Sequence, residues 1–162
     1  YEVLNRLSNT GIISKKNTLL DYGSGKGRVS IFMSYQTKCR SIGIEYDERI
    51  FERAMANKAD SISGNRVTFL CMDALKYEIP NEVDRIFFFN PFSLEIFSSV
   101  LGNVLQSYYE KPREMFLIFY YPSYEYLMHI SQEYSLKLYD EIDCSDISDG
   151  EQEREKIVIY GF

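Results

Sequence analysis

The sequence has few of the residues on which metal sites and disulfide-linked folds depend. Its 162 residues include no tryptophan, one histidine and three cysteines. The cysteines, Cys39, Cys71 and Cys144, lie far apart and form no Cys-x-x-Cys pair, so we expect neither a disulfide framework nor a metal site. An odd, dispersed set of thiols is typical of a reducing compartment, and we expect a cytoplasmic protein. Cys71 lies in an apolar run, and we expect it to be buried.

Long apolar runs and an excess of basic residues are also absent. No apolar stretch approaches the length that spans a membrane, and no signal peptide is recognisable. The formal net charge of −6 argues against a general nucleic-acid-binding surface, which is usually basic. Hydrophobic residues make up 45% of the chain, and we expect one domain over residues 1–162. Because the chain opens at Tyr1 and not at a methionine, we expect an upstream segment to precede it.

The most informative motif lies near the beginning of the chain. An apolar run ends at Asp21, and three glycines follow at alternate positions, Gly23, Gly25 and Gly27, before a helical pattern begins. This order predicts a strand, a tight turn and a helix N-terminus. Glycine tolerates positive φ and has no Cβ, and a helix start offers free N–H groups, so a ligand can lie directly on such a turn. The motif therefore indicates a nucleotide-like ligand.

The rest of the chain alternates strand and helix patterns. Strands are expected at residues 18–22, 41–46, 66–71, 83–89 and 115–120, and helices at 25–35, 47–59, 94–108 and 123–130. Two further strands, 135–142 and 156–160, have no helical pattern between them and should pair antiparallel. Their connection, residues 144–155, is polar and acidic, and the acidic stretch 140–155 is expected to be a solvated loop. These patterns predict an α/β three-layer sandwich with a mostly parallel seven-stranded sheet and a C-terminal antiparallel hairpin.

Two acidic residues end strands where a ligand of such a sheet would bind. In open α/β sheets, ligands lie beyond the carboxyl ends of the strands. Glu45 ends the second strand, and a carboxylate there can accept hydrogen bonds from a ribose diol, or can simply be an exposed acid. Asp73 and Ala74 follow the third strand. Asp73 could accept from the exocyclic amine of adenine, or could be an ordinary helix N-cap.

The fourth and fifth strands are followed by polar and aromatic residues. Asn90 offers a donor and an acceptor, Pro91 fixes the next backbone segment, and Phe92 supplies a flat apolar wall. These three residues suit a planar polar group, although Asn-Pro is also a common turn. The aromatic pair at residues 120–121 could form a substrate wall, or could pack beneath a helix.

With these motifs in this order, the chain resembles the class I S-adenosylmethionine-dependent methyltransferases over nearly its whole length. The resemblance is most specific at residues 21–27. It implies a Rossmann-like fold and S-adenosyl-L-methionine as cofactor, with the glycine loop around its methionine part, Glu45 on the ribose and Asp73 at the adenine. The cofactor-binding residues that it implies are Asp21, Tyr22, Gly23, Ser24, Gly25, Gly27, Glu45, Tyr46, Asp73, Ala74 and Asn90.

The resemblance also extends to the acceptor side. Asn90, Pro91 and Phe92 are similar to the Asn-Pro-Pro-aromatic signature of enzymes that methylate planar amines, although this chain has one proline where the signature has two. They are the expected catalytic residues, and the acceptor is an unidentified small molecule, protein or nucleic-acid amine. Methyl transfer from a sulfonium needs mainly alignment and exclusion of water, so the lack of a catalytic-looking His or Cys is no objection.

Two other functions compete with methyl transfer. A non-catalytic module could keep the fold and the cofactor, since fold does not dictate function. A nicotinamide-dependent oxidoreductase would need a glycine at the position of Arg28, where its third glycine packs helix against strand, and is disfavoured. A P-loop is excluded because no G-x-x-x-x-G-K-[ST] occurs.

Overall fold

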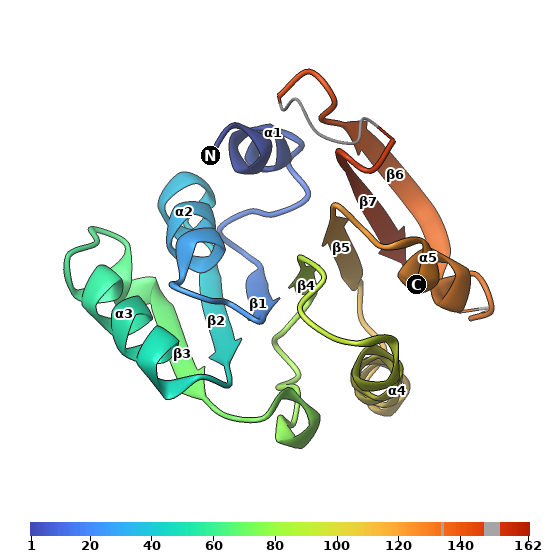
Figure 1. Cartoon of the computed structure of the whole chain (residues 1–162), viewed down its shortest axis with the longest axis horizontal. Coiled ribbons are helices and arrows are strands. Elements are labelled where there is room, and N and C mark those ends of the chain that lie inside the picture. The colour runs from blue at the N-terminus through green and yellow to red at the C-terminus, as the bar shows by residue number, and fades with distance from the viewer. Residues whose placement is uncertain (134, 148–152) are drawn as a thin grey trace.

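The computed structural model describes residues 1–133, 135–147 and 153–162, and their centre is a seven-stranded sheet (Figure 1). The strand order is β3-β2-β1-β4-β5-β7-β6. The strands are β1 (Thr18–Tyr22), β2 (Arg40–Glu45), β3 (Val67–Cys71), β4 (Arg85–Phe88), β5 (Phe116–Tyr120), β6 (Lys137–Asp143) and β7 (Lys156–Gly161). The first five run parallel, and β7 lies antiparallel between β5 and β6. The predicted α/β sheet with its C-terminal antiparallel hairpin is therefore confirmed.

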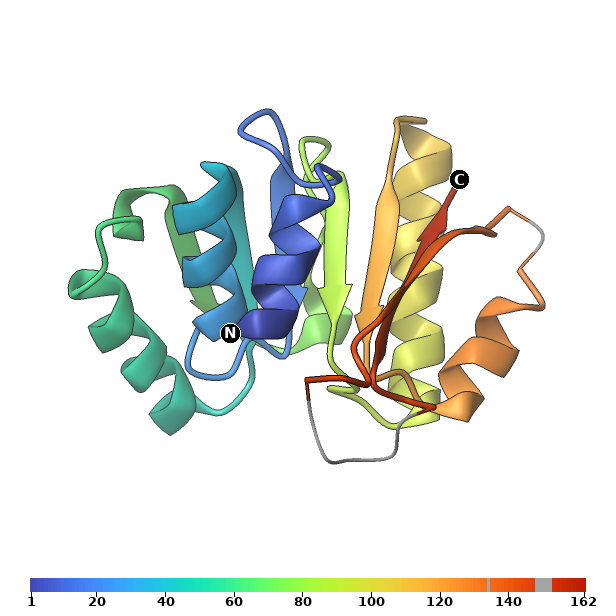
Figure 2. The same ribbon diagram turned by 90° about the horizontal axis from the view of Figure 1, so that it is seen from above.

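Helices cover both faces of the sheet and make the three layers (Figure 2). On one face lie α1 (Glu2–Asn9), α2 (Arg28–Thr37) and α3 (Glu48–Ala59), and on the other lie α4 (Leu94–Glu110) and α5 (Tyr124–Ile130). Two 3₁₀ turns, η1 (Gly64–Arg66) and η2 (Ala74–Lys76), flank β3. Among the described residues, no helix combines the length and the apolar character that crossing a membrane requires.

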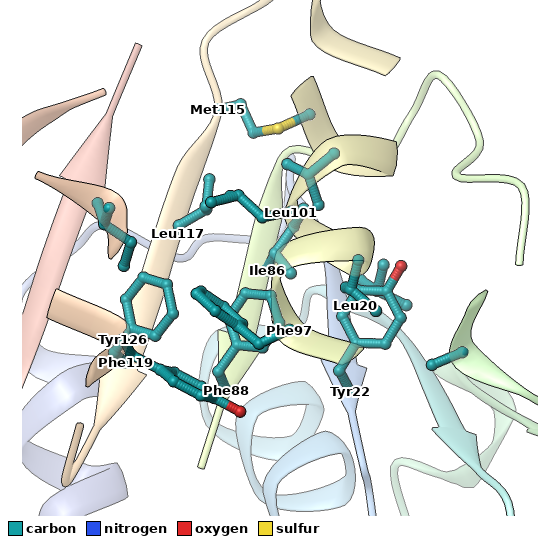
Figure 3. Close-up of a cluster of buried hydrophobic side chains, with 14 of the residues drawn as sticks. Leu20, Tyr22, Ile86, Phe88, Phe97, Leu101, Met115, Leu117, Phe119 and Tyr126 are labelled. Carbon is teal, nitrogen blue, oxygen red and sulfur yellow. The ribbon is translucent and has the colours of Figure 1, made fainter. Parts of the chain in front are cut away.

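The core is divided by the sheet into two main clusters. Successive strand residues point to opposite faces, so the central strands must be apolar along their whole length. Toward α4, the side chains of Leu20, Ile86 and Leu117 meet Phe97 and Leu101 (Figure 3). Toward α1 and α2, the cluster includes Leu7, Leu19, Met33, Phe87 and Ile118. Burial on both faces fixes the register of the strands and hence the positions at which they end.

Some local expectations were wrong, and each has a physical reason. Helix α2 begins at Arg28 and not at Gly25, because Gly25 and Gly27 have φ of +56° and +82°, outside the helical region. The helix α1 was not predicted, although it buries Val3, Leu4 and Leu7. Cys71 is exposed, because it ends an edge strand. Part of the expected acidic loop, residues 148–152, lies outside the described residues.

Two tyrosines in the core differ in what their hydroxyls contact. The ring of Tyr22 stacks on Phe88 with centroids 5.5 Å apart, but its buried hydroxyl has no hydrogen-bond partner among the described residues. The hydroxyl of Tyr126 donates to the carbonyl of Phe92 at 2.7 Å and accepts from its N–H at 3.1 Å. Burial of an unpaired hydroxyl costs free energy, whereas a paired one contributes to stability.

We therefore expect opposite effects from the same substitution at these positions. Tyr22→Phe should leave the free energy of unfolding unchanged or raise it by about 1 kcal/mol, whereas Tyr126→Phe should lower it by about 1–3 kcal/mol. Urea unfolding of the two variants beside the wild type measures both values. An equal loss of stability in both variants would show that the Tyr22 hydroxyl is satisfied.

Candidate functional site

The loop between β1 and α2 is built from three left-handed glycines with different surroundings. The φ angles of Gly23, Gly25 and Gly27 are +67°, +56° and +82°. A Cβ on Gly23 would lie 2.4 Å from Cβ of Pro91, and one on Gly27 would lie 2.3 Å from the ring of Phe69. A Cβ on Gly25 would meet no atom within 4 Å. Packing thus fixes the two outer glycines, while the middle one faces open space into which a ligand can fit.

The Glu45 carboxylate holds this loop against the end of β2. Its Oε2 accepts from the N–H of Gly25 at 2.9 Å, and its Oε1 accepts from the N–H groups of Tyr46 at 2.9 Å and Asp47 at 3.0 Å. An ionised carboxylate has about four acceptor positions, so about one remains. The same side chain can therefore fix the glycine loop and still accept from a ligand hydroxyl.

A second carboxylate, Asp21, lies buried at the end of β1. It is 2% exposed, and its Oδ2 accepts from the hydroxyl of Ser30 at 2.9 Å. Burial raises the pKa of Asp21 to about 7, opposed by the hydrogen bonding of Ser30 and assisted by the negative charge of Glu45. A positive charge on a ligand of the adjoining loop would favour the ionised form.

Ser24 leaves a polar atom without a partner under the loop. Its N–H donates to the carbonyl of Ile44 at 2.9 Å, whereas its buried hydroxyl has no hydrogen-bond partner among the described residues. A Cβ at Gly43 would lie 2.8 Å from Cβ of Ser24, so β2 approaches the loop closely. An unpaired hydroxyl here, the open space at Gly25 and the two carboxylates fit a polar ligand that carries a positive charge and a hydroxyl.

The ends of β2 and β3 bring the remaining predicted cofactor residues together. The N–H of Met72 donates to the carbonyl of Glu45 at 3.0 Å, which joins the two strand ends. Asp73 caps η2 by accepting from the N–H of Leu75 at 2.9 Å, as the alternative interpretation of this residue expected. Ala74 is buried, and the side chain of Tyr46 is 78% exposed. Their proposed contacts with a ligand stay predictions.

Asn90 follows β4, and its side chain contacts the connection after β5. The amide nitrogen donates to the carbonyl of Tyr121, and Oδ1 accepts from the N–H of Ser123 at 3.1 Å. Asn90 and Tyr121 have φ of +42° and +51°, and are two of the three non-glycine residues with positive φ among the described residues. Strained residues of this kind cluster at functional sites.

The aromatic residues near Asn90 are arranged differently from the sequence expectation. The ring of Phe92 meets the buried Tyr22 edge-on, with centroids 5.9 Å apart, so Phe92 faces the core. The ring exposed at this strand end is Phe89, which is 56% exposed and lies 4.9 Å from the ring of Tyr120. Phe89 was not among the expected site residues, although its place at the end of an expected strand was a usable signal.

Glu155 was also missed, because it falls in the acidic segment that was expected to be solvated. It is 8% exposed, and its Oε2 accepts from the hydroxyl of Tyr120 at 2.9 Å. Burial, and next the neighbouring Glu155 carboxylate, raise the pKa of Tyr120, so its hydroxyl stays protonated and donates. In the described parts of the chain, no group of three or more His, Cys, Asp or Glu side chains is arranged to hold a metal ion.

Comparison with known proteins gives a family match and many similar folds. The sequence profile of a family described as "Methyltransferase domain" matches residues 19–110, more than half of the chain. That stretch contains the glycine loop and the ends of the first four strands. Among curated proteins, none matches this chain in sequence.

Solved structures resemble the chain over almost its full length. An RNA methyltransferase from Salinibacter ruber, in complex with S-adenosyl-L-homocysteine, is 18% identical, with 99% of this chain and 89% of that chain covered and a TM-score of 0.63. An S-adenosylmethionine-dependent methyltransferase from Aquifex aeolicus is 15% identical, with 98% of this chain and 88% of that chain covered and a TM-score of 0.72. Precorrin-6y C5,15-methyltransferase from Geobacter metallireducens is 14% identical, with 99% of this chain and 87% of that chain covered and a TM-score of 0.71. At these identities the likeness concerns the fold.

The family match covers the same strand ends that carry the glycine loop, Glu45, Asp73 and Asn90. The sheet order and the antiparallel β7 agree with the fold of the methyltransferases that the chain resembles. The chain therefore belongs to the class I S-adenosylmethionine-dependent methyltransferase family.

Proposed function

We propose that this chain binds S-adenosylmethionine on the glycine loop and transfers its methyl group to an acceptor at the carboxyl ends of β4 and β5. The observation that carries the proposal is the contrast within the loop. Gly23 and Gly27 are closed in by Pro91 and Phe69, whereas Gly25 faces open space with its N–H held by Glu45. A backbone so arranged suits close approach of a ligand to Gly25.

Each part of the donor has a matching residue in this proposal. The methionine part lies along residues 23–27, next to Asp21 and the free hydroxyl of Ser24. The remaining acceptor position of Glu45 takes a ribose hydroxyl, and the adenine lies near Asp73 and Ala74, with the exposed ring of Tyr46 beside it. The positive charge of the donor stabilises the ionised form of Asp21.

These residues contribute to catalysis by placing the acceptor in line with the methyl group of the donor. When bound, the donor supplies a methyl carbon that is already activated by its sulfonium. The chain orients the acceptor, excludes water and keeps the two sites at a fixed separation. Contact of Pro91 with Gly23 supports this role, because it joins the segment after β4 directly to the donor loop.

A planar amine nitrogen is the acceptor atom that the amide of Asn90 favours, whereas the ring of Phe92 packs on Tyr22 and does not face the acceptor. To accept from such an amine, Oδ1 of Asn90 would exchange its bond with the N–H of Ser123. Both polar atoms of the Asn90 amide are already bonded to the segment after β5. This supports a second candidate, a module that binds the donor without transferring its methyl group. A screen with isotope-labelled donor separates the two, since only an enzyme labels an acceptor.

The first prediction for this function concerns Gly25. Gly25→Ala should weaken binding of S-adenosylhomocysteine by about tenfold or more, because its Cβ would fill the space that the ligand needs. Gly11→Ala is the matched control, since Gly11 also has positive φ (+77°) and no atom within 4 Å of a built Cβ. It lies in the connection from α1 into the start of β1, whereas the glycine loop follows the end of that strand.

Titration calorimetry of both variants, with unfolding curves alongside, measures binding and stability separately. The backbone strain of about 1–2 kcal/mol should be similar in the two variants, so only binding should differ. Unchanged affinity in Gly25→Ala, or equal losses in both variants, would contradict donor binding on this loop.

The second prediction concerns the pH dependence of binding. Below its pKa of about 7, Asp21 is mostly protonated in the free protein, and a cationic donor must displace that proton. Affinity for S-adenosylmethionine should therefore rise by about tenfold between about pH 6 and pH 8. Asp21→Asn should remove this rise, which calorimetry at several pH values would detect. A variant with the pH dependence of the wild type would show that Asp21 does not sense the donor.

A further inference from the structure

One aromatic pair, the exposed Phe89 and the partly buried Tyr120, lies beside the proposed transfer site. Phe89 follows β4 directly and is 56% exposed, although residues 85–88 before it are buried. Its ring lies 4.9 Å from that of Tyr120 at the end of β5. A phenylalanine left half in water at a ligand-binding edge presents a flat apolar surface to whatever binds there.

The backbone after Phe89 is held by contacts of the next two residues. The next residue, Asn90, is held at positive φ by its two bonds to the segment after β5, and Pro91 packs on Gly23. Phe89 is therefore tied to the donor loop within two residues. A strained backbone held by hydrogen bonds and packing keeps the side chain of Phe89 at one place relative to the donor loop.

The ring of Tyr120, the second of the pair, is held by contacts with β7 and with the residue before it. The hydroxyl of Tyr120 donates to the buried carboxylate of Glu155, and the strand register pairs Tyr120 with Ile157 of β7. The cations in this region are engaged: Arg154 lies over the ring of Tyr121 at 4.2 Å, and Lys156 pairs with Glu141 at 3.0 Å. The neighbourhood thus offers flat aromatic surfaces, and the net charge of −6 does not suit a polyanion.

We propose that Phe89 and Tyr120 form the acceptor platform, and that the acceptor is a small, flat aromatic molecule that is uncharged or cationic. This inference rests on the proposed methyl transfer and adds the substrate class. Stacking on Phe89 would place the plane of the acceptor beside the strand end from which Asn90 departs. Glu155 acts on the platform as a positioning residue, because it holds Tyr120 and not the acceptor.

The test uses two amines of the same charge and similar size, one flat and one not. Tryptamine and 2-cyclohexylethylamine are titrated into the full chain saturated with S-adenosylhomocysteine. Tryptamine should bind about fivefold to tenfold more tightly, because only a flat ring stacks. Phe89→Ala and Phe89→Leu should both remove that preference, since leucine restores bulk but not flatness. Tyr139→Ala, which removes an aromatic ring of similar exposure (59%) on β6, should keep the preference.

Each other outcome has a distinct meaning. If the chain fails to bind S-adenosylhomocysteine, the proposed function itself is wrong. If that ligand binds but tryptamine shows no preference, or keeps it in both Phe89 variants, the platform is wrong and the proposed function stands. If a single-stranded oligonucleotide binds to the loaded protein and displaces tryptamine, the acceptor is a base in a polymer and the assignment of a small molecule is overturned.

Discussion

The hydrogen bond from the Gly25 N–H to the Glu45 carboxylate is the interaction on which the site depends. It joins the loop after β1 to the end of β2, and the same carboxylate also accepts from the N–H groups of Tyr46 and Asp47. One half-buried carboxylate at the end of β2 thus sets the positions of the glycine loop and of the start of α3. Because parallel strands end at one edge of the sheet, this local contact also places the loop beside the ends of β3 and β4.

The same edge shows how close packing leaves room for a ligand at one place. Pro91 lies against Gly23 and Phe69 against Gly27, so side chains from β3 and from the segment after β4 press on the loop from both ends. Only the middle glycine stays open. At the ends of β4 and β5, Asn90 and Tyr121 both have left-handed conformations and are joined by a hydrogen bond, beside the paired rings of Phe89 and Tyr120. In the proposed function, Pro91 therefore couples the donor and acceptor positions, because it packs against Gly23.

Much of the fold could be predicted because its signals are local. Continuous apolar runs marked the buried strands, and the Asp47 and Ser123 caps were readable from residue type. The start of α2 was misplaced because glycine permits both helix and left-handed loop. The exposure of Cys71 depended on which strand lies at the sheet edge. The partners of Asn90 and Tyr120 lie 31 and 35 residues away, so no local pattern could show that Asn90 binds the chain itself or that Glu155 is buried.

Backbone NMR during titration with S-adenosylhomocysteine tests the central claim most directly. If the donor lies on the glycine loop, the amide resonances of Gly23, Gly25 and Tyr46 should shift most, and those of Leu138 and Tyr139 on the edge strand β6 should stay unchanged. The account would be contradicted if the ligand bound while the resonances of residues 23–27 did not move.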